Sequence, residues 1–432
     1  AAKYLPMILN YSVKKADYIE ADAAVIEIIN RNAKRFGHSF NDKRVLVNNL
    51  NARDFLARQN EKYDLILIGF GLPANLRANG FYAKEFFQKA KNNLKPDGFL
   101  ALKLPGKMVY SSYIMAELNA CVSKTLKSVF KNVKIIPGEQ NILIASDAKM
   151  PFRFEIKKRL AGVQETVLVL SKYYLDDRMD TQKTKWLAAE LKKARGKVSV
   201  NSDLNPQGFI NSVLYLQAGF SPRLSVFLDK TLRYSYLFAL AAALLLFQKS
   251  MRKTTAFSSG AACLWMFLIV LFYFRIINGQ IFKLGAIFSA CFVLGISAAC
   301  LFNNKFKRVT SLNKKIFNCE LAFALLAVFL YCAFKFFDLK TFPASLFIFA
   351  LGFAGGFEFL KLYEIPALLG NDKEKSASGG VMPAYIFGAA LACLLGGGFL
   401  IFAWGFERSL LFVLFFKFLT FCRWADISKR GL

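Results

Sequence analysis

Seven long apolar runs fill residues 231–432 of this 432-residue chain and limit what that part can fold into. A helix needs about 20 predominantly apolar residues to cross the hydrocarbon core of a bilayer, because each residue rises only about 1.5 Å. The five middle runs meet this length, whereas the first and the last are shorter. The runs are Leu232–Phe247, Thr255–Phe274, Leu284–Phe302, Ile316–Phe334, Ala344–Leu360, Val381–Trp404 and Ser409–Cys422. We therefore predict an all-α polytopic membrane domain at residues 231–432, with six or seven spanning helices.

The distribution of basic residues agrees with a membrane domain. The chain has a net charge of +29, and residues 231–432 contain 21 Lys and Arg against 8 Asp and Glu, many of them in short loops between apolar runs. Basic loops of this kind are typical of membrane proteins beside anionic lipid. A nucleic-acid-binding surface would instead combine basic and aromatic residues in one cluster, and the sequence has none. We expect a lipid bilayer as a partner and no nucleic acid.

Cysteine and histidine usage excludes several classes of site. Seven of the eight cysteines lie in the apolar half and no two have CxxC spacing, so neither a zinc site nor a disulfide framework is indicated. His38 is the only histidine, which excludes a Ser-His-Asp triad and any multi-histidine metal site within this chain. We expect no metal. The sequence starts at Ala1 without a methionine or a signal-peptide pattern, which we interpret as a fragment or a processed product.

Residues 1–149 alternate strand-like and helix-like segments, which indicates an α/β domain with a parallel or mostly parallel sheet covered by helices. We predict strands at Ala16–Glu20, Val45–Asn49, Tyr63–Gly69, Leu94–Leu104, VKIIP and NILIAS. We predict helices near Ala2–Asn10 and at Ala21–Arg35, Ala52–Arg58, Ala83–Asn93 and Ser111–Phe130. Residues 150–230, with a helix over Tyr173–Arg195, form a predicted helical appendage and linker.

The third predicted strand has an unusual end, because residues 65–73 read LILIGFGLP. In nucleotide-handling α/β domains, ligands lie at the carboxyl ends of central strands, where an acid or base is expected. Here the strand ends in Gly69, and no residue of 68–79 is acidic. By contrast, the first strand is closed by Glu20 in DYIEAD, where a carboxylate can accept hydrogen bonds from both ribose hydroxyls.

An ordered series of short segments resembles a known family. The series is YIEAD, NNLNARDFL, YDLILIG, NGFYAKEFF and LKPDGFLALKLPG, followed by KTLKSVFKNVKIIPGEQNILIAS and VNSDLNP. Over about residues 1–220 it resembles the spermidine synthase family (polyamine aminopropyltransferases), and is closest to the bacterial branch fused to transmembrane helices. The resemblance implies a Rossmann-like, methyltransferase-type domain that binds S-adenosylmethionine or its decarboxylated form as a co-substrate. It also implies transfer of an aminopropyl group to a diamine.

The resemblance assigns cofactor-binding roles to four residues. Glu20 matches the family's ribose-binding acid, with Asp22 two residues further on. Asn51, followed by Ala52, stands where the family has an aspartate that reaches the adenine amino group. An amide oxygen can still accept that hydrogen bond, so nucleoside binding is compatible with Asn51.

The catalytic positions depart from the family's pattern. Gly69 and Leu72 occupy the positions of the two aspartates in the family's D-x-x-D-P loop. Of the three residues in that motif, this chain has only the proline, Pro73. Those carboxylates would hold a cationic diamine and take the proton that an ammonium group (reference pKa ~10.4) loses before it attacks. Tyr82 is a remaining catalytic candidate and, with Glu85, matches the family's FYxxEF element. A purely structural role, as an aromatic and a charged residue at the start of a helix, explains that match equally well.

The family's glycine-rich loop, which lets the backbone approach the cofactor, would precede the helix near Ala2–Asn10. Ala1 comes just after that position. We expect poor cofactor affinity if the chain is complete, and a loop upstream of Ala1 if it is a fragment.

These residues leave three functions open. The first is a membrane-anchored, spermidine-synthase-like protein that binds a nucleoside thioether but has a degenerate active site without useful aminopropyl transfer. The second is an active aminopropyltransferase that uses another carboxylate, such as Glu85 or Asp203. The third is a transporter-like membrane protein with a non-catalytic soluble domain. Oligomeric state is left open.

Two acids bear on the transporter hypothesis, because intramembrane acids often mark transport pathways. Glu320 lies near Lys315, and Glu358 is three residues before Lys361. We therefore expect both carboxylates to snorkel to the membrane interface, rather than to form a transport site.

The loop charges predict an orientation. If all seven runs span the membrane, the face with the C-terminal tail has 14 Lys and Arg, against 5 on the face shared with residues 1–230. The positive-inside rule would then place residues 1–230 outside the cytoplasm, although nucleoside cofactors are cytosolic. If Leu232–Phe247 lies in the interface, six spans remain and both regions face the cytoplasm. We favour an integral protein of a bacterial inner (plasma) membrane with a cytoplasmic soluble domain.

Cysteine-accessibility labelling tests this orientation. With six spans, cysteines introduced into residues 1–230 and into the loop 305–315 react from the same side of the membrane, because two spans separate the loop from residue 250. Labelling from opposite sides would exclude the six-span arrangement.

Overall fold

The computed structural model describes residues 4–32, 39–107, 112–150, 177, 180–237, 250–278, 281–303, 312–336, 341–369 and 380–429. The chain divides into two compact units. The N-terminal unit comprises Ala1–Ser202 and Gln207–Leu216, and the helical unit comprises Asp203–Pro206 and Gln217–Leu432. His38 and most of the predicted run Leu232–Phe247 lie outside the described residues.

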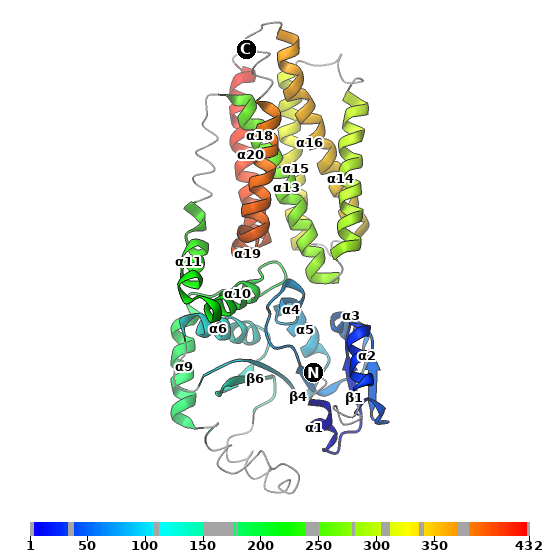
Figure 1. Ribbon diagram of the computed structural model, residues 1–432, viewed down its shortest axis with the longest axis vertical. Helices are drawn as coiled ribbons and strands as arrows, with labels where there is room; N and C mark the ends of the chain where they lie inside the picture. The colour runs from blue at the N-terminus through cyan, green and yellow to red at the C-terminus, as the bar shows by residue number, and fades with distance from the viewer. Residues whose placement is uncertain are drawn as a thin grey trace. The chain divides into compact units, whose positions relative to one another are not determined.

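The described strands of the N-terminal unit form two sheets (Figure 1). They are β1 (Ala16–Ile19), β2 (Val45–Asn48), β3 (Tyr63–Ile68), β4 (Leu94–Pro105), β5 (Asn132–Ile136) and β6 (Gln140–Ser146). One sheet pairs β1 with β2 in parallel; the other has the order β3-β4-β6-β5, in which β3 and β4 are parallel and the remaining pairs antiparallel. The α/β prediction is confirmed, but the second sheet is mixed rather than mostly parallel. Only three residues, Pro137 to Glu139, link β5 to β6, and so short a connection permits antiparallel pairing alone.

Helices follow most of these strands, as the alternation predicts. They are α1 (Leu5–Leu9), α2 (Ala23–Arg31), α3 (Ala52–Arg58), α4 (Leu76–Gly80), α5 (Lys84–Asn92), α6 (Tyr113–Lys127), α9 (Thr181–Arg195), α10 (Gln207–Phe220) and α11 (Pro222–Arg233), with a 3-10 turn at Ser39–Asn41. Several begin at a polar side chain that accepts a hydrogen bond from a first-turn backbone N–H, which satisfies a donor that the helix leaves unpaired. These caps are Asp22, Asn51, Asn75, Ser112 and Asp180.

The core of the N-terminal unit forms around β4. Leu100, Leu102 and Leu104 alternate along this strand and are at most 1% exposed. They belong to one cluster with Phe87 of α5 and Leu126 of α6. Because alternate residues of a strand point to the same face, this spacing directs all three leucines against the covering helices.

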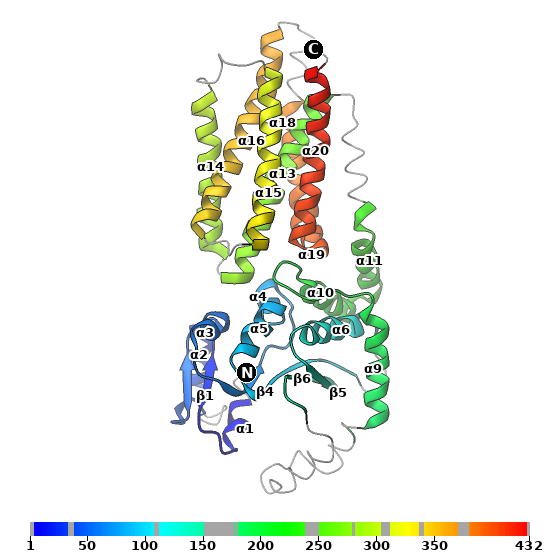
Figure 2. The ribbon, with the colours of Figure 1, turned by 180° about the vertical axis from the view of Figure 1, so that it is seen from behind.

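A side-chain hydrogen bond connects the two sheets. The Tyr63 hydroxyl of β3 donates to Asp17 Oδ2 of β1 over 2.8 Å and accepts from Gln59 Nε2 over 2.9 Å. Burial, together with the Asp17 carboxylate, raises the pKa of Tyr63 to about 12. In Figures 1 and 2, β1 lies beside α2 and α3 and apart from β4 and β6.

The helical unit is a bundle whose long helices run side by side in Figures 1 and 2. Its helices are α13 (Met251–Asn278), α14 (Ile281–Asn303), α15 (Leu312–Phe336), α16 (Thr341–Leu369), α18 (Val381–Leu391), α19 (Ile401–Trp404) and α20 (Phe406–Lys429). Among the described residues, four segments are long and apolar enough to cross a membrane. They are Met251–Ile277, Lys283–Asn303, Lys314–Phe336 and Thr341–Tyr363.

The last two predicted runs differ from simple spans. Val381–Trp404 contains a stretch of π-helix, Ala392–Leu400, between α18 and α19. Gly405, with a φ of 79°, then separates α19 from α20 in a conformation that favours glycine. The run Ser409–Cys422 lies within α20 and includes Lys417. The number of spans and their orientation remain predictions.

Glycines allow two helix pairs to approach closely. A Cβ added at Gly295 of α14 would overlap the carbonyl oxygen of Phe349, and one at Gly352 of α16 would overlap that of Phe292. Gly260 of α13 and Gly388 of α18 have the same relation to the partner backbone. Small residues let helix backbones pack at short range, so these glycines permit the close approach of α14 to α16 and of α13 to α18.

Glu320 and Glu358 differ from their expected positions. Both are 0% exposed inside the bundle, and both lie within ion-pair distance of Lys417, which the sequence analysis did not single out. The expectation that they snorkel is therefore wrong for this structure. Nearness to Lys315 or Lys361 in sequence does not decide which way a carboxylate points on its helix.

The glycine packing predicts different effects at two positions of α14. Gly295→Ala should destabilise the helical unit by about 1–3 kcal/mol, because the new methyl group overlaps the α16 backbone. Gly285→Ala is the matched control, since its Cβ would meet only Leu271 Cδ1 at 3.8 Å. Thermal unfolding in nanodiscs compares the two variants with the wild type. Equal unfolding temperatures for both variants would contradict the close α14–α16 contact.

Candidate functional site

The ends of β1 and β2 form the centre of the candidate site. The Glu20 backbone N–H donates to the Asn48 carbonyl over 3.0 Å, and the Asn49 Nδ2 group donates to the Glu20 carbonyl over 3.0 Å. Because the two strands are parallel, their carboxyl ends lie at the same edge. The first predicted site residue thus lies directly beside the segment that leads to Asn51.

The Glu20 side chain is positioned by the chain that follows it. Its Oε1 accepts a hydrogen bond from the Asp22 backbone N–H at 3.1 Å. Asp22 in turn caps α2, and its Oδ1 accepts from the Ala24 backbone N–H at 3.0 Å. Glu20 is half-buried and Asp22 is exposed. A carboxylate has about four acceptor sites, so Glu20 retains the capacity to bind two ribose hydroxyls.

Asn51 and Ala52 start α3 at the same edge. Asn51 Oδ1 accepts from the Arg53 backbone N–H at 3.1 Å, and this bond orients the amide at the helix start. Both residues are half-buried. The cap uses one of the two lone pairs of Oδ1, so the second can still accept a bond from an exocyclic amine.

The end of β3 is closed by aromatic packing. The fully buried Tyr82 donates its hydroxyl hydrogen to the Phe70 carbonyl at 2.7 Å, and burial raises the pKa of Tyr82. Phe70 also stacks on Phe81, with ring centroids 4.5 Å apart and 7° between the planes. Gly69 and Leu72 are half-buried in this loop. Tyr82 therefore holds the loop by a hydrogen bond to its backbone.

No carboxylate lies within the loop from Gly69 to Asn75. Glu85 is in the first turn of α5 and is half-buried, and Asp203 belongs to the helical unit. The structure thus brings Glu20, Asp22 and Asn51 to one edge, while the β3 end offers backbone and apolar groups.

Asn49 is a site residue that the sequence analysis did not single out. Its amide bridges the carboxyl ends of β1 and β2 through the Glu20 carbonyl. The available signal was its position as the last residue of the predicted strand Val45–Asn49, at the carboxyl end where ligand-binding groups of a parallel sheet lie.

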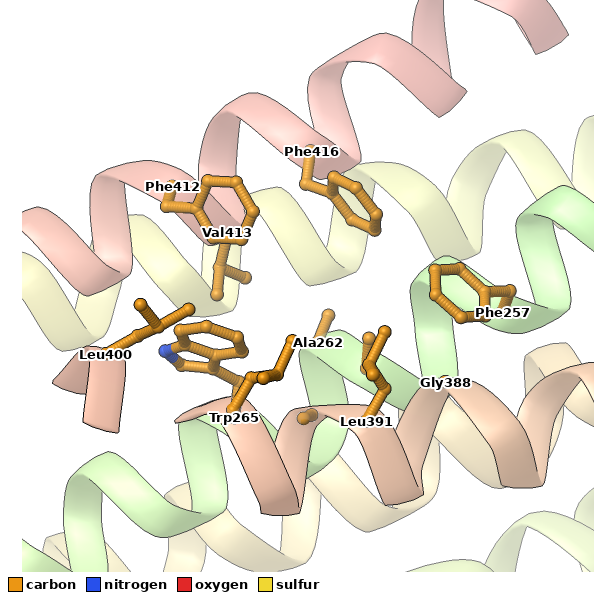
Figure 3. Close-up of a pocket in the computed structure, with 12 residues that line it drawn as sticks. Phe257, Ala262, Trp265, Gly388, Leu391, Leu400, Phe412, Val413 and Phe416 are labelled. Carbon is orange, nitrogen blue, oxygen red and sulfur yellow. The ribbon is translucent and has the colours of Figure 1, made fainter. Parts of the chain in front are cut away.

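A second candidate is an apolar pocket in the helical unit (Figure 3). Side chains from α13, α18, the π-helix and α20 line it, among them Phe257, Trp265, Leu391, Phe412 and Phe416. Its lining has no titratable side chain. Such a pocket suits an apolar molecule and does not suit a diamine or a nucleotide.

Comparison with known proteins identifies a similar domain. Residues 3–150 match the family model of the spermine/spermidine synthase domain. The polyamine aminopropyltransferase of Oceanobacillus iheyensis is 31% identical over 131 residues, which is 29% of this chain and 25% of the relative. Polyamine aminopropyltransferase 2 of Aquifex aeolicus is 26% identical over 155 residues, or 34% and 31% of the two chains. The matched region thus spans between a quarter and a third of these curated relatives.

Two solved structures are also similar to part of the chain. A spermidine synthase in complex with the transition state analogue AdoDATO has a TM-score of 0.36 and 17% identity, and covers 44% of this chain and 65% of that one. Spermidine synthase from Thermotoga maritima has a TM-score of 0.36 and 18% identity, with 44% and 64% covered. The N-terminal unit contains a spermidine-synthase-like domain with a methyltransferase-like fold, and a helical region follows it. Within its described residues, this region has four helices long and apolar enough to cross a membrane.

Proposed function

We propose that the N-terminal unit binds an adenosyl thioether or sulfonium compound, S-adenosylmethionine or its decarboxylated form, without useful aminopropyl transfer. The helical unit anchors it in the inner membrane of a bacterium, with the N-terminal unit facing the cytoplasm. The observation that carries the proposal is the position of Glu20 at the shared carboxyl edge of β1 and β2, where it is hydrogen-bonded to Asn48 and Asn49 just before Asn51.

The chemistry of this edge suits a nucleoside. Glu20 offers an oriented carboxylate to the two ribose hydroxyls, and Asn51 offers an amide oxygen to an adenine amino group. Asp22 and Ala52 are close to them in sequence at the same edge, where they would contact the nucleoside. The match of residues 3–150 to the spermine/spermidine synthase domain supports the same ligand class.

The residues at the end of β3 argue against catalysis by the N-terminal unit. A diamine is a dication at neutral pH, and its attacking amine must first lose a proton to a base. Gly69 and Leu72 offer neither a base nor an anion, and the Tyr82 hydroxyl hydrogen is committed to the Phe70 carbonyl. The aminopropyltransferase activity of the similar proteins therefore does not follow for this chain.

The binding proposal predicts a selective effect of Glu20→Ala. The variant loses two charge-assisted hydrogen bonds worth roughly 1.5–3 kcal/mol each, so the affinity for 5′-methylthioadenosine should fall at least about 100-fold. Glu27→Ala is the matched control, because Glu27 is an exposed acid on α2 that pairs only with Arg31 on its own helix among its described contacts. Isothermal calorimetry on the full chain measures both. Equal affinities for the wild type and Glu20→Ala would contradict the proposal.

A second prediction concerns transfer. General base catalysis contributes about 10²–10⁴-fold, and a poorly held amine is also poorly oriented, so the wild type should form no spermidine from decarboxylated S-adenosylmethionine and putrescine. The double variant Gly69→Asp, Leu72→Asp is needed for any activity. Gly405 is the one described glycine with φ in the left-handed region, so Asp at position 69 meets no backbone penalty of that kind. Robust spermidine formation by the wild type would contradict this prediction and favour a base from elsewhere, such as Glu85 or Asp203.

A further inference from the structure

A cluster of charged side chains lies inside the helical unit. Lys417 of α20, Glu320 of α15 and Glu358 of α16 all have 0% exposed side chains. The Lys417 Nζ atom is 2.9 Å from Glu320 Oε2 and 3.8 Å from Glu358 Oε2. Burying a charged side chain in an apolar helix bundle is energetically unfavourable. Charged residues found at such positions commonly take part in proton or ion movement.

The Lys417–Glu320 pair has several further contacts, although Glu320 Oε1 accepts no hydrogen bond from the described residues. The Lys417 ammonium also donates to Ser259 Oγ at 2.9 Å and lies 4.4 Å from the centroid of the Phe323 ring. Glu320 Oε2 accepts a further hydrogen bond from Thr420 Oγ1 at 2.9 Å. Hydrogen bonds and a cation–π contact of this kind offset the removal of both charges from water. These two groups therefore form a stable ion pair.

Glu358 lacks such support. Neither of its oxygens accepts a hydrogen bond of good geometry from any residue that the structure describes, although the side chains of Ser259 and Glu320 lie close enough to interact with it. The 3.8 Å separation from Lys417 Nζ is beyond hydrogen-bond distance. An ionised carboxylate buried without hydrogen bonds is strongly unfavourable, whereas the protonated form carries no charge. A proton is also the one cation that needs no set of coordinating oxygens.

The other titratable groups around Glu358 come from each neighbouring helix. They are Cys263 of α13, Cys319 of α15, Lys361 of α16 and Tyr385 of α18, besides Glu320 and Lys417. Lys361 is fully buried one turn beyond Glu358, with its ammonium 5.2 Å from the Phe357 ring centroid. One turn before Glu358, a Cβ on Gly355 would meet both Cys263 Sγ and Tyr385 Oη. Cys263 and Tyr385 thus face α16 one turn from Glu358.

We propose that Glu358 is a proton-binding site of the helical unit, at which the carboxylate takes up one proton and releases it again. The Lys417–Glu320 pair remains charged beside it. Its electrostatic field acts on both the protonated and the ionised form of Glu358. No other bond changes in this step. The site is separate from the nucleoside edge, so it gives the helical unit a chemistry beyond anchoring.

Infrared spectroscopy of the full chain in nanodiscs tests the protonation. At neutral pH, the difference spectrum of wild type minus Glu358→Gln should contain the carbonyl stretch of a protonated carboxyl group. The band should shift in D₂O, because an exchanging proton is replaced by deuterium. A wild type without the band, or a band that does not shift, would overturn the proposal. Replacing choline by sodium at constant ionic strength should leave the band unchanged; its loss would assign the site to a metal cation.

Unfolding temperatures separate a proton site from a static ion triad. Glu358→Gln should unfold at the wild-type temperature, because it replaces a neutral group with a neutral group of the same shape. Glu320→Gln should unfold roughly 5–10 °C lower, since it leaves Lys417 buried without its partner. Equal losses in the two variants would show that Glu358 is a permanent anion and would overturn the proposal.

Discussion

The hydrogen bond from the Glu20 backbone N–H to the Asn48 carbonyl, 3.0 Å long, is the interaction on which the candidate nucleoside site depends. It continues the parallel β1–β2 ladder by one residue beyond the last paired strand position, Ile19 with Asn48. The register therefore brings the one acid at the end of β1 to the segment that leads to α3. A shift of one residue would direct Glu20 to the opposite face of the sheet.

In the proposed function, binding and catalysis would depend on different strand ends, so that one could persist without the other. The β1–β2 edge carries polar groups whose orientation is fixed by backbone bonds, from Asp22 to Glu20 and from Arg53 to Asn51. The β3 end is held instead by the Tyr82 hydroxyl and by stacked phenylalanines. A loop closed in this way keeps its shape without carboxylates, so the loss of both aspartates is compatible with an intact fold.

The sequence predicted the elements near the site well, because local patterns determine them. The ranges of α3 and β4 were predicted to within a residue, and the caps at Asp22 and Asn51 explain where their helices begin. The two closing strands, VKIIP and NILIAS, were predicted, but their antiparallel pairing was not, since pairing direction depends on the short β5–β6 link rather than on periodicity. The buried cluster was also missed, because Lys417 and Glu320 are about a hundred residues apart in sequence and only helix packing brings them together.

Hydrogen–deuterium exchange with and without 5′-methylthioadenosine tests the central claim, that the nucleoside binds at the β1–β2 edge and not at the β3 end. The account predicts slower amide exchange in residues 19–22 and 48–53 when the nucleoside is present, because a bound ligand restrains the backbone that holds Glu20 and Asn51. It predicts unchanged exchange in residues 69–75. Protection confined to residues 69–75, with none at 19–22, would contradict it.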